Sequence, residues 1–306
     1  MKLNALRDFL AVAERGSVRA AARQLRLSQP AMTRSIQELE KELGAELFER
    51  RTRGVALTPM GEVFLRRAQA LRSEMRRAQD EIDQLKGKLH GHLRICLSSG
   101  AHMALLPQAL RPFRQRYPDV TLEIIDAVLP RIERELLDGT LDLYIGPSYD
   151  DVSTELTVEK LFDNQRVVLA RKGHPLAGAT SLAQLVGAEW VTTSVTHRAE
   201  DELSPVFERL GLPAPRMVVQ GHSALTFFLS VAYSDLLMML PVQWLQSPPF
   251  NSLLVRVPVR EPLWAPPICI VRRSGLPLTP AGEYFCDMTR RAAAHQEALA
   301  VAALRA

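Results

Sequence analysis

Residues 17–43 read SVRAAARQLRLSQPAMTRSIQELEKEL, and they contain two short helical patterns separated by a break of two or three residues. Each pattern begins with a serine, Ser17 or Ser28, whose hydroxyl can cap the first free backbone N–H groups of a helix. In the first pattern, small apolar residues recur at spacings of three and four, so one face can pack closely under a partner helix. Together the two patterns predict a helix-turn-helix.

The second pattern has a free outward face at its start. Pro30 lies in the first turn, where its missing N–H costs little, and we expect Ile36, Leu39 and Leu43 to point inward. The residues expected to face outward are Gln29, Ala31, Met32, Thr33 and Arg34. Their amide, hydroxyl, guanidinium and methyl-sized groups are of the types that read base edges in a major groove. We therefore predict that the DNA-contacting residues of this helix are Gln29, Pro30, Ala31, Thr33 and Arg34. An ordinary surface hairpin of helices is the alternative.

A larger set of residues with fixed spacings extends this pattern over the first sixty positions. The set is Ser17, Ala20, Ala21, Leu25, Ser28 to Ala31, Arg34, Ile36, Leu39, Glu40, Leu43, Gly44, Leu47, Phe48, Arg50 and Leu57 to Pro59. In these residues the chain resembles the N-terminal domain of the LysR-type bacterial transcriptional regulators, and its length and later layout are similar to that family from end to end. The resemblance implies a DNA-binding regulator, usually a homotetramer, with RNA polymerase as a further partner.

Composition and charge agree with such a protein. The chain has 306 residues, of which 47% are hydrophobic, which is enough for two or three domains with buried cores. Residues 1–90 hold 18 Lys and Arg against 12 Asp and Glu, whereas the rest of the chain holds 20 against 22. The basic excess therefore accompanies the helix-turn-helix, as phosphate contacts require, although a basic face can also serve solubility alone.

The start of the chain predicts a cytoplasmic protein, and the cysteines predict buried thiols. Charged residues interrupt the first apolar stretch, so we expect neither a secretory signal nor a membrane span there. Cys96, Cys269 and Cys286 are odd in number and far apart, and we predict buried structural thiols, with a redox switch or a metal site as the alternative.

The residues on either side of the helix-turn-helix complete a small DNA-binding domain over residues 1–58, with the helix-turn-helix at about 17–36. Residues 3–15 predict a first helix that ends at Gly16. Residues 47–57 have the length and turn chemistry of a two-stranded wing, with arginines at its tip. We expect Arg51 and Arg53 to lie against phosphates or in a minor groove, whereas the alternative is a solvated charge cluster.

A long linker helix is predicted over residues 59–88, beginning at Thr58 and Pro59. Apolar residues follow at heptad spacing: Phe64, Ala68, Leu71, Met75, Ala78, Ile82 and Leu85. We call these seven residues the seam. Because such a seam needs a partner helix, we predict a homodimer through this helix and hence a double-stranded DNA site with an inverted repeat.

The chain after the predicted hinge, Gly87 to Gly91, alternates strands with helices, which predicts α/β architecture with a parallel sheet. We expect an effector-binding domain over residues 89–306 with two lobes, similar in layout to a periplasmic binding protein. Lobe 1 covers about 89–163 and 267–306, and lobe 2 about 164–266. Residues 278–283 nearly repeat residues 57–62, which we interpret as shared helix capping.

A small-molecule effector is expected at the carboxyl ends of the strands, where the turn Ser98 to Gly100 and then His102 follow a strand pattern. The resemblance implies the same place for Ser98, Ser99 and His102, and implies that residues near Val128 and Gly146 and the loop with Thr196 and Arg198 line the cleft. Hydroxyls, an imidazole and a guanidinium favour a small organic anion. The alternative is that Ser98 and Ser99 only cap a helix.

Other classes of function have little support in the sequence. There is no Walker loop, GxSxG elbow or HExxH pair, and the seven histidines show no metal-ligand spacing, so we expect no enzyme, cofactor or metal. A transport-type solute-binding protein would suit two lobes but not a fused helix-turn-helix. A DNA-binding regulator without an effector is the alternative that the sequence leaves open.

Overall fold

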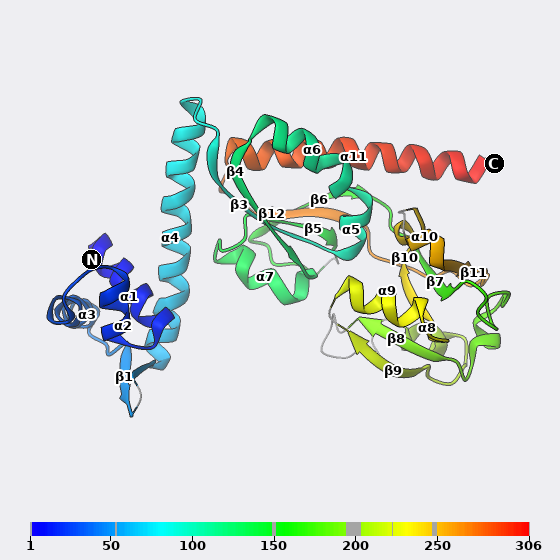
Figure 1. The fold of residues 1–306 in the computed structure, drawn as a ribbon, viewed down its shortest axis with the longest axis horizontal. Helices are drawn as coiled ribbons and strands as arrows, with labels where there is room; N and C mark the ends of the chain where they lie inside the picture. Colours follow the sequence, from blue (N-terminus) through cyan, green and yellow to red (C-terminus); the bar gives the residue numbers. More distant parts are fainter. Residues whose placement is uncertain are drawn as a thin grey trace. The chain divides into compact units, whose positions relative to one another are not determined.

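The computed structural model describes residues 2–52, 54–148, 151–193, 203–221, 223–246 and 250–305. They form two compact units (Figure 1). The first contains Met1–Gln79 with Asp138–Thr140, and the second contains Asp80–Leu137 with Leu141–Ala306. No helix among the described residues is both long enough and apolar enough to cross a bilayer.

Three helices form the core of the first unit: α1 (Leu3–Arg15), α2 (Val18–Gln24) and α3 (Gln29–Leu43). Gly16 ends α1 in the left-handed conformation, with φ of 60°. The hydroxyl of Ser17 accepts a hydrogen bond from the backbone N–H of Ala20 at 3.4 Å, and that of Ser28 accepts from Ala31 at 3.3 Å. The predicted helices and their capping serines are therefore confirmed.

Two expectations about α3 are wrong. Met32, expected to face outward, is fully buried in the core with Phe9 and Ala21 because it lies one turn before the inward-facing Ile36. Leu43, expected to point inward, is 42% exposed. It is the last residue of the helix, and the buried stripe of α3 ends one turn earlier.

The predicted wing is confirmed as an antiparallel hairpin of β1 (Phe48–Arg51) and β2 (Gly54–Leu57). The wing is bonded to the end of α1, since the N–H of Val55 donates to the carbonyl of Gly16 at 2.9 Å. After it, the hydroxyl of Thr58 accepts from the N–H of Gly61 at 3.0 Å and so caps α4 (Pro59–Leu85).

Lobe 1 of the second unit is built on a five-stranded sheet in the order β4-β3-β5-β12-β6. The strands are β3 (His90–Leu97), β4 (Asp119–Asp126), β5 (Leu143–Pro147), β6 (Leu156–Phe162) and β12 (Ile268–Arg273). The predicted parallel sheet is mixed instead, because β12 returns from lobe 2 and pairs antiparallel with both β5 and β6. Only β4, β3 and β5 are parallel.

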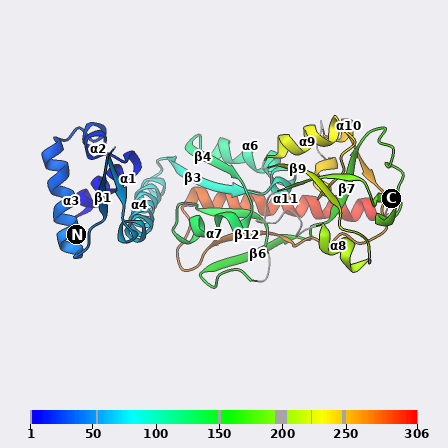
Figure 2. The ribbon, with the colours of Figure 1, turned by 90° about the horizontal axis from the view of Figure 1, so that it is seen from below.

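Helices cover both faces of this sheet (Figures 1 and 2). One face packs against α6 and α11 around Phe113 and Phe285, and the other packs against α7 around Ile132 and Tyr144. The helices of lobe 1 are α5 (Ser99–Ala104), α6 (Leu106–Arg116), α7 (Leu129–Leu137) and α11 (Pro280–Arg305). Since α5 begins at Ser99 with Ser98 as its N-cap, the residues expected to form a turn, Ser98 to Gly100, are the start of a helix.

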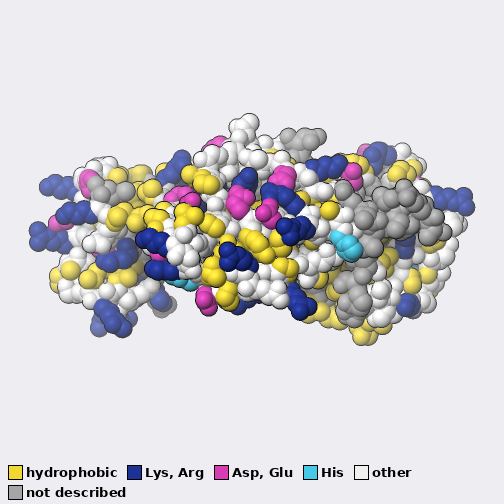
Figure 3. All heavy atoms as spheres, turned by 90° about the horizontal axis from the view of Figure 1, so that it is seen from above, with side chains coloured by type: hydrophobic (Ala, Val, Ile, Leu, Met, Phe, Trp, Pro, Cys, Tyr) yellow, Lys and Arg dark blue, Asp and Glu magenta, His cyan; other side chains and the backbone are white. Residues whose placement is uncertain are grey.

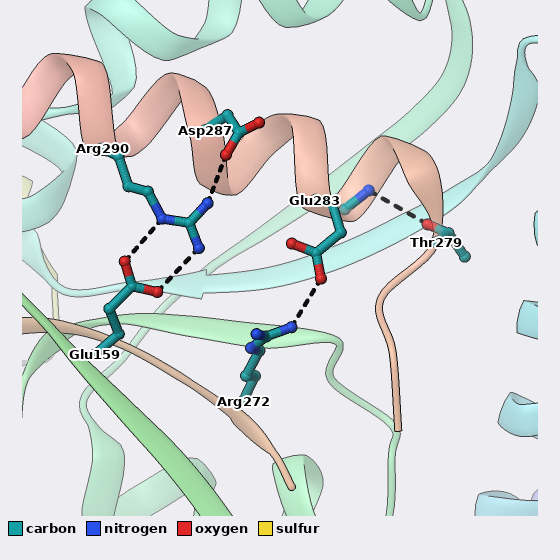
Figure 4. A network of polar contacts seen from close by, with 7 residues as sticks. Glu159, Arg272, Thr279, Glu283, Asp287 and Arg290 are labelled. Atoms are coloured by element: carbon teal, nitrogen blue, oxygen red, sulfur yellow. Dashed lines mark hydrogen bonds and ion pairs between the residues drawn. The ribbon is translucent and has the colours of Figure 1, made fainter. Parts of the chain in front are cut away.

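Ion pairs hold α11 on the edge of the sheet (Figure 4). The guanidinium of Arg290 bonds both carboxylate oxygens of Glu159 on β6, at 2.7 and 2.9 Å, and Asp287 one turn earlier. Arg272 on β12 donates to Glu283 at 2.7 Å. These pairs fix the first half of α11 relative to strands that lie far from it in the sequence.

Lobe 2 has a mixed arrangement of strands with two buried tryptophans, Trp190 and Trp244, which belong to two separate apolar clusters. Its strands β10 and β11 pair antiparallel with β7 between them, while β8 and β9 pair parallel. Its elements are β7 (Arg166–Arg171), η1 (Leu182–Leu185), β8 (Glu189–Thr193), α8 (Ser204–Arg209), β9 (Arg216–Gly221), α9 (Ala224–Ala232), β10 (Met238–Pro241), η2 (Val242–Gln246), α10 (Phe250–Leu253) and β11 (Leu254–Val257).

Candidate DNA-contacting surface and effector site

The first turns of α3 present a polar surface to solvent. Gln29, Pro30, Ala31 and Arg34 are exposed, and Thr33 is half-buried. The Arg34 side chain is 81% exposed, and its Nε donates to the Glu38 carboxylate at 2.9 Å. An exposed pair of this kind contributes little, so the guanidinium can leave it for an acceptor on a base.

The wing carries further exposed cations. Arg51 pairs with Glu49 at 2.6 Å on the same strand, and Arg50 is also exposed. Arg53, predicted beside them, lies outside the described residues. Figure 3 shows Lys and Arg side chains standing out from the first unit on one face, whereas cations and anions are intermixed on the second unit. The predicted basic excess is thus a surface property.

The seam of α4 has two different parts. Ala68 is buried in the core of the first unit with Phe64 packed against that core. The later seam residues are open to solvent, with Leu71 at 45%, Met75 at 46%, Ile82 at 47% and Leu85 at 75% exposure. Apolar side chains at this spacing and exposure can pack against a second helix.

Four of the predicted effector-site residues meet at the carboxyl end of β3. Ser98 is buried: its N–H donates to Ile145 at 2.9 Å, and its hydroxyl accepts from Ala101 at 3.3 Å. His102 Nδ1 lies 3.1 Å from the Ser98 carbonyl oxygen, and Ser99 between them is half-buried. A Cβ on Gly146 would lie 2.8 Å from the Ser98 Cβ. The Ser98 hydroxyl caps α5. Of these four residues, Ser99 and His102 are the ones that remain partly exposed.

The other predicted residues are less informative. Val128 is half-buried in the segment between β4 and α7. Thr196 and Arg198 lie outside the described residues. A Cβ on Gly146 would also lie 2.2 Å from the Tyr144 hydroxyl oxygen, so the glycine is needed for packing as well as for any role in a site.

Asp126 is a residue that our sequence reasoning missed. It ends β4 opposite Leu97 of β3 and hence lies beside Ser98. Desolvation raises the pKa of its carboxyl group, and this effect is only partly offset by nearby His102 and by a hydrogen bond from the backbone of Ala224. Ala224 begins α9 of lobe 2, so the end of β4 lies near lobe 2 next to the predicted site. An acidic residue at the carboxyl end of a strand pattern was the signal that could have identified it.

A second contact places the same region at the boundary of the lobes. A Cβ on Gly100, in the first turn of α5, would lie 3.1 Å from Cγ of Pro241 in lobe 2. The serine, histidine and aspartate groups near Gly100 are therefore brought together where lobe 1 meets lobe 2.

The three cysteines lie in the interior of the protein. All three are free and buried, which confirms the predicted structural thiols. Burial raises the pKa of Cys96 and Cys286 to about 12 and that of Cys269 to about 11, so the reactive thiolate is scarce at neutral pH. In the part of the chain that the structure describes, no group of His, Cys, Asp and Glu side chains is suited to a metal ion.

A winged helix-turn-helix, a long helix and a two-lobed α/β domain define a class of DNA-binding regulators that respond to small molecules. Two family models match this chain. The bacterial regulatory helix-turn-helix protein, lysR family, matches residues 3–62, and the LysR substrate binding domain matches residues 86–294. The chain therefore belongs to the LysR family of transcriptional regulators.

Individual relatives agree with this assignment. The chain is 28% identical over 256 residues to the HTH-type transcriptional regulator TdcA of Escherichia coli strain K12, covering 83% of this chain and 81% of that protein. It is 31% identical over 247 residues to the SDS degradation transcriptional activation protein of a Pseudomonas species, covering 78% and 79%. These relatives are regulators, and so is this chain, which makes the enzyme and solute-binding alternatives wrong.

Solved structures show the same fold. The structure of full-length CbnR complexed with its target DNA has a TM-score of 0.70 at 22% identity, covering 95% of this chain and 100% of that one. Full-length BenM has a TM-score of 0.54 at 25% identity, covering 97% and 98%. The mixed α/β architecture and the order of domains are those of full-length LysR-type regulators.

Proposed function

We propose that α3 reads its operator in the major groove through Gln29, Pro30, Ala31, Thr33 and Arg34, while Arg51 and Arg53 of the wing contact the backbone or the minor groove. The observation that carries this proposal is the division of α3 into two sides. Met32, Ile36 and Leu39 are buried, and this fixes the helix so that its polar first turns face solvent.

We also propose that the protein acts in the cytoplasm as a homodimer through α4, with a homotetramer as the full assembly and RNA polymerase as a further partner. The exposed part of the seam supports the dimer. A two-fold dimer presents two copies of α3, so the operator should be an inverted repeat.

The effector of this regulator is, we propose, a small organic anion bound between the lobes. Ser98, Ser99, His102, Val128 and Gly146 supply one side of the site, and Thr196 and Arg198 supply a hydroxyl and a guanidinium. The position at the carboxyl ends of β3, β4 and β5 supports it, because ligands of open α/β sheets bind there. Asp126 does not exclude an anion, because His102 and the backbone of Ala224 lie near its carboxylate and partly compensate its charge.

Thermal unfolding of the purified protein with pooled small aromatic and aliphatic acids tests this site. A ligand at about one hundred times its Kd stabilises the folded state by about 2.7 kcal/mol, which raises the Tm by several degrees. We expect one pool to do so, with a smaller shift in His102→Ala and an unchanged shift in Arg34→Ala, the control in the DNA-binding unit. If no pool shifts the Tm while operator binding is normal, the protein is a regulator without an effector of this class.

A further inference from the structure

The last two turns of α4 are bonded to lobe 1 through two buried polar side chains. The Asp80 carboxylate accepts a hydrogen bond from the backbone N–H of His92 at 3.2 Å. The Gln84 amide accepts from the N–H of Ala281 at 2.9 Å and donates to the carbonyl of His90 at 3.3 Å. Both side chains are less than a tenth exposed. Buried polar groups of this kind are costly to leave unbonded, so these contacts resist opening.

The glycines of the predicted hinge have definite structural roles. Gly87, with φ of 83°, ends α4. Its N–H donates to the carbonyl of Gln84 at 3.0 Å, and the N–H of Lys88 donates to the backbone carbonyl of Asp83 at 2.9 Å. This is the bonding of a helix that terminates at a left-handed glycine. Gly91, with φ of 143°, lets β3 approach α4, since a Cβ there would lie 2.9 Å from Gln84 Nε2 and 3.1 Å from Asp80 Cγ.

The contact with Ala281 uses a free donor at the start of α11. Thr279 caps this helix by accepting from the N–H of Gly282 at 3.3 Å, just as Thr58 accepts from Gly61 at the start of α4. The repeated sequence at residues 57–62 and 278–283 is therefore shared capping, as predicted. At α11 the threonine does not reach the N–H of Ala281, and Gln84 satisfies it instead.

From these contacts we propose that Asp80 and Gln84 are positioning residues that make the end of the linker helix part of the effector-binding domain. The joint between the DNA-binding and effector-binding units then lies before Asp80 and not at Gly87 to Gly91. The division into compact units agrees with this, because it places Asp80 and all later residues except Asp138–Thr140 in the second unit. A displacement at the start of α11 is passed directly to α4 in such an arrangement, because no flexible hinge lies between them.

Hydrogen exchange on the full-length protein tests the bonds themselves. We compare the wild type with the double variant Asp80→Ala/Gln84→Ala and with Glu81→Ala/Lys86→Ala, which removes two neighbouring side chains outside the bonded set. The double variant should lose about ten-fold or more of the protection at His92 and Ala281, while β5 keeps its protection and shows that lobe 1 is folded. Equal protection in the wild type and the double variant would overturn the proposal.

Spin labels test whether α4 and lobe 1 move together. Labels at Lys86→Cys, directly after α4, and at Gln108→Cys on α6 occupy exposed positions, and the buried native thiols do not compete for the label. Labelled chains are diluted with unlabelled protein so that only distances within a chain are seen. We expect one narrow distance in the wild type and a broad distribution in Asp80→Ala/Gln84→Ala and in Gly91→Ala. A broad wild-type distribution, or a narrow one in both variants, would contradict a joint before Asp80.

Discussion

The backbone of Gly54 in the wing lies directly against the carbonyl oxygen of Gly16 at the end of α1. A Cβ on Gly54 would lie 2.2 Å from that oxygen, and the residue has φ of 119°, which side chains rarely allow. The neighbouring Val55 bonds the same oxygen at 2.9 Å. The wing is thus positioned by the end of α1, the helix that precedes the helix-turn-helix, and not by its own two strands alone.

Replacing Gly54 with alanine should therefore displace the wing. We expect the free energy of unfolding of the DNA-binding unit to fall by about 2 kcal/mol and operator affinity to fall with it, because both the clash and the backbone strain must be relieved. Gly44→Ala is the matched control: Gly44 has φ of 67° but no atom within 4 Å of an added Cβ. Chemical denaturation should show the larger loss for Gly54→Ala, and equal losses would contradict the close approach.

Arg34→Ala should remove specific DNA binding and leave the dimer intact. A good base contact contributes about 1–3 kcal/mol of discrimination, so operator affinity should fall by about 5- to 150-fold while non-specific binding changes little. Lys41→Ala removes the same charge from an exposed position near the end of α3 and serves as the control. Titration with operator and random DNA measures both affinities. Normal operator binding by Arg34→Ala would show that α3 is not the recognition helix.

Leu71→Glu should weaken the dimer. Leu71 lies in the middle of the exposed seam, and a charge buried between two helices there should raise the dimer dissociation constant by about one hundred-fold. The control is Arg72→Glu, which introduces the same side chain at the next position, where it is exposed and outside the seam. Sedimentation over a range of concentrations compares the two variants. A wild-type protein that is monomeric at low concentration yet binds its operator with full affinity would rule out the dimer as the DNA-binding form.

The bidentate pair of Glu159 with Arg290 should make stability depend on pH on the acid side. The hydrogen bonds from Arg290 hold the pKa of the Glu159 carboxyl below its usual value of 4.5. Its contribution is therefore complete above that value and is lost as the pH falls through the lower, folded-state pKa. Because both side chains are about a third exposed, we expect Glu159→Gln to cost only about 1 kcal/mol near neutral pH.

Urea unfolding at neutral pH and in steps below it measures this contribution. The difference between wild type and Glu159→Gln should shrink as the acid is titrated, whereas Glu155→Gln, at an exposed acid just before β6, should differ little from wild type throughout. A difference that is constant with pH would mean that the charge of Glu159 does not contribute.

Local patterns in the sequence predicted the DNA-binding unit well, because its signals lie close together in the chain. Ser17, Ser28 and Gly16 end or begin helices through bonds to residues three or four positions away, and a sequence shows such spacings directly. The error at Leu43 arose because a periodic pattern does not show where the core beneath a helix stops.

The effector-binding domain was predicted less completely because its decisive contacts are long-range. The direction of β12 depends on a strand that returns after lobe 2, and the alternation of strands and helices that predicted a parallel sheet contains no information about that return. Asp126 lies near Ala224 of the other lobe, a proximity that no spacing in the chain records.

Footprinting on the DNA immediately upstream of the protein's own reading frame tests operator recognition and effector control together. The protein is bound in about 100 mM salt, with and without pooled small aromatic and aliphatic acids. An effector-controlled regulator should protect a long, two-part region whose length or hypersensitive bands change with one pool. A protected region that is indifferent to every pool would contradict control by a small organic anion, and the absence of any protected region would contradict operator recognition at this site.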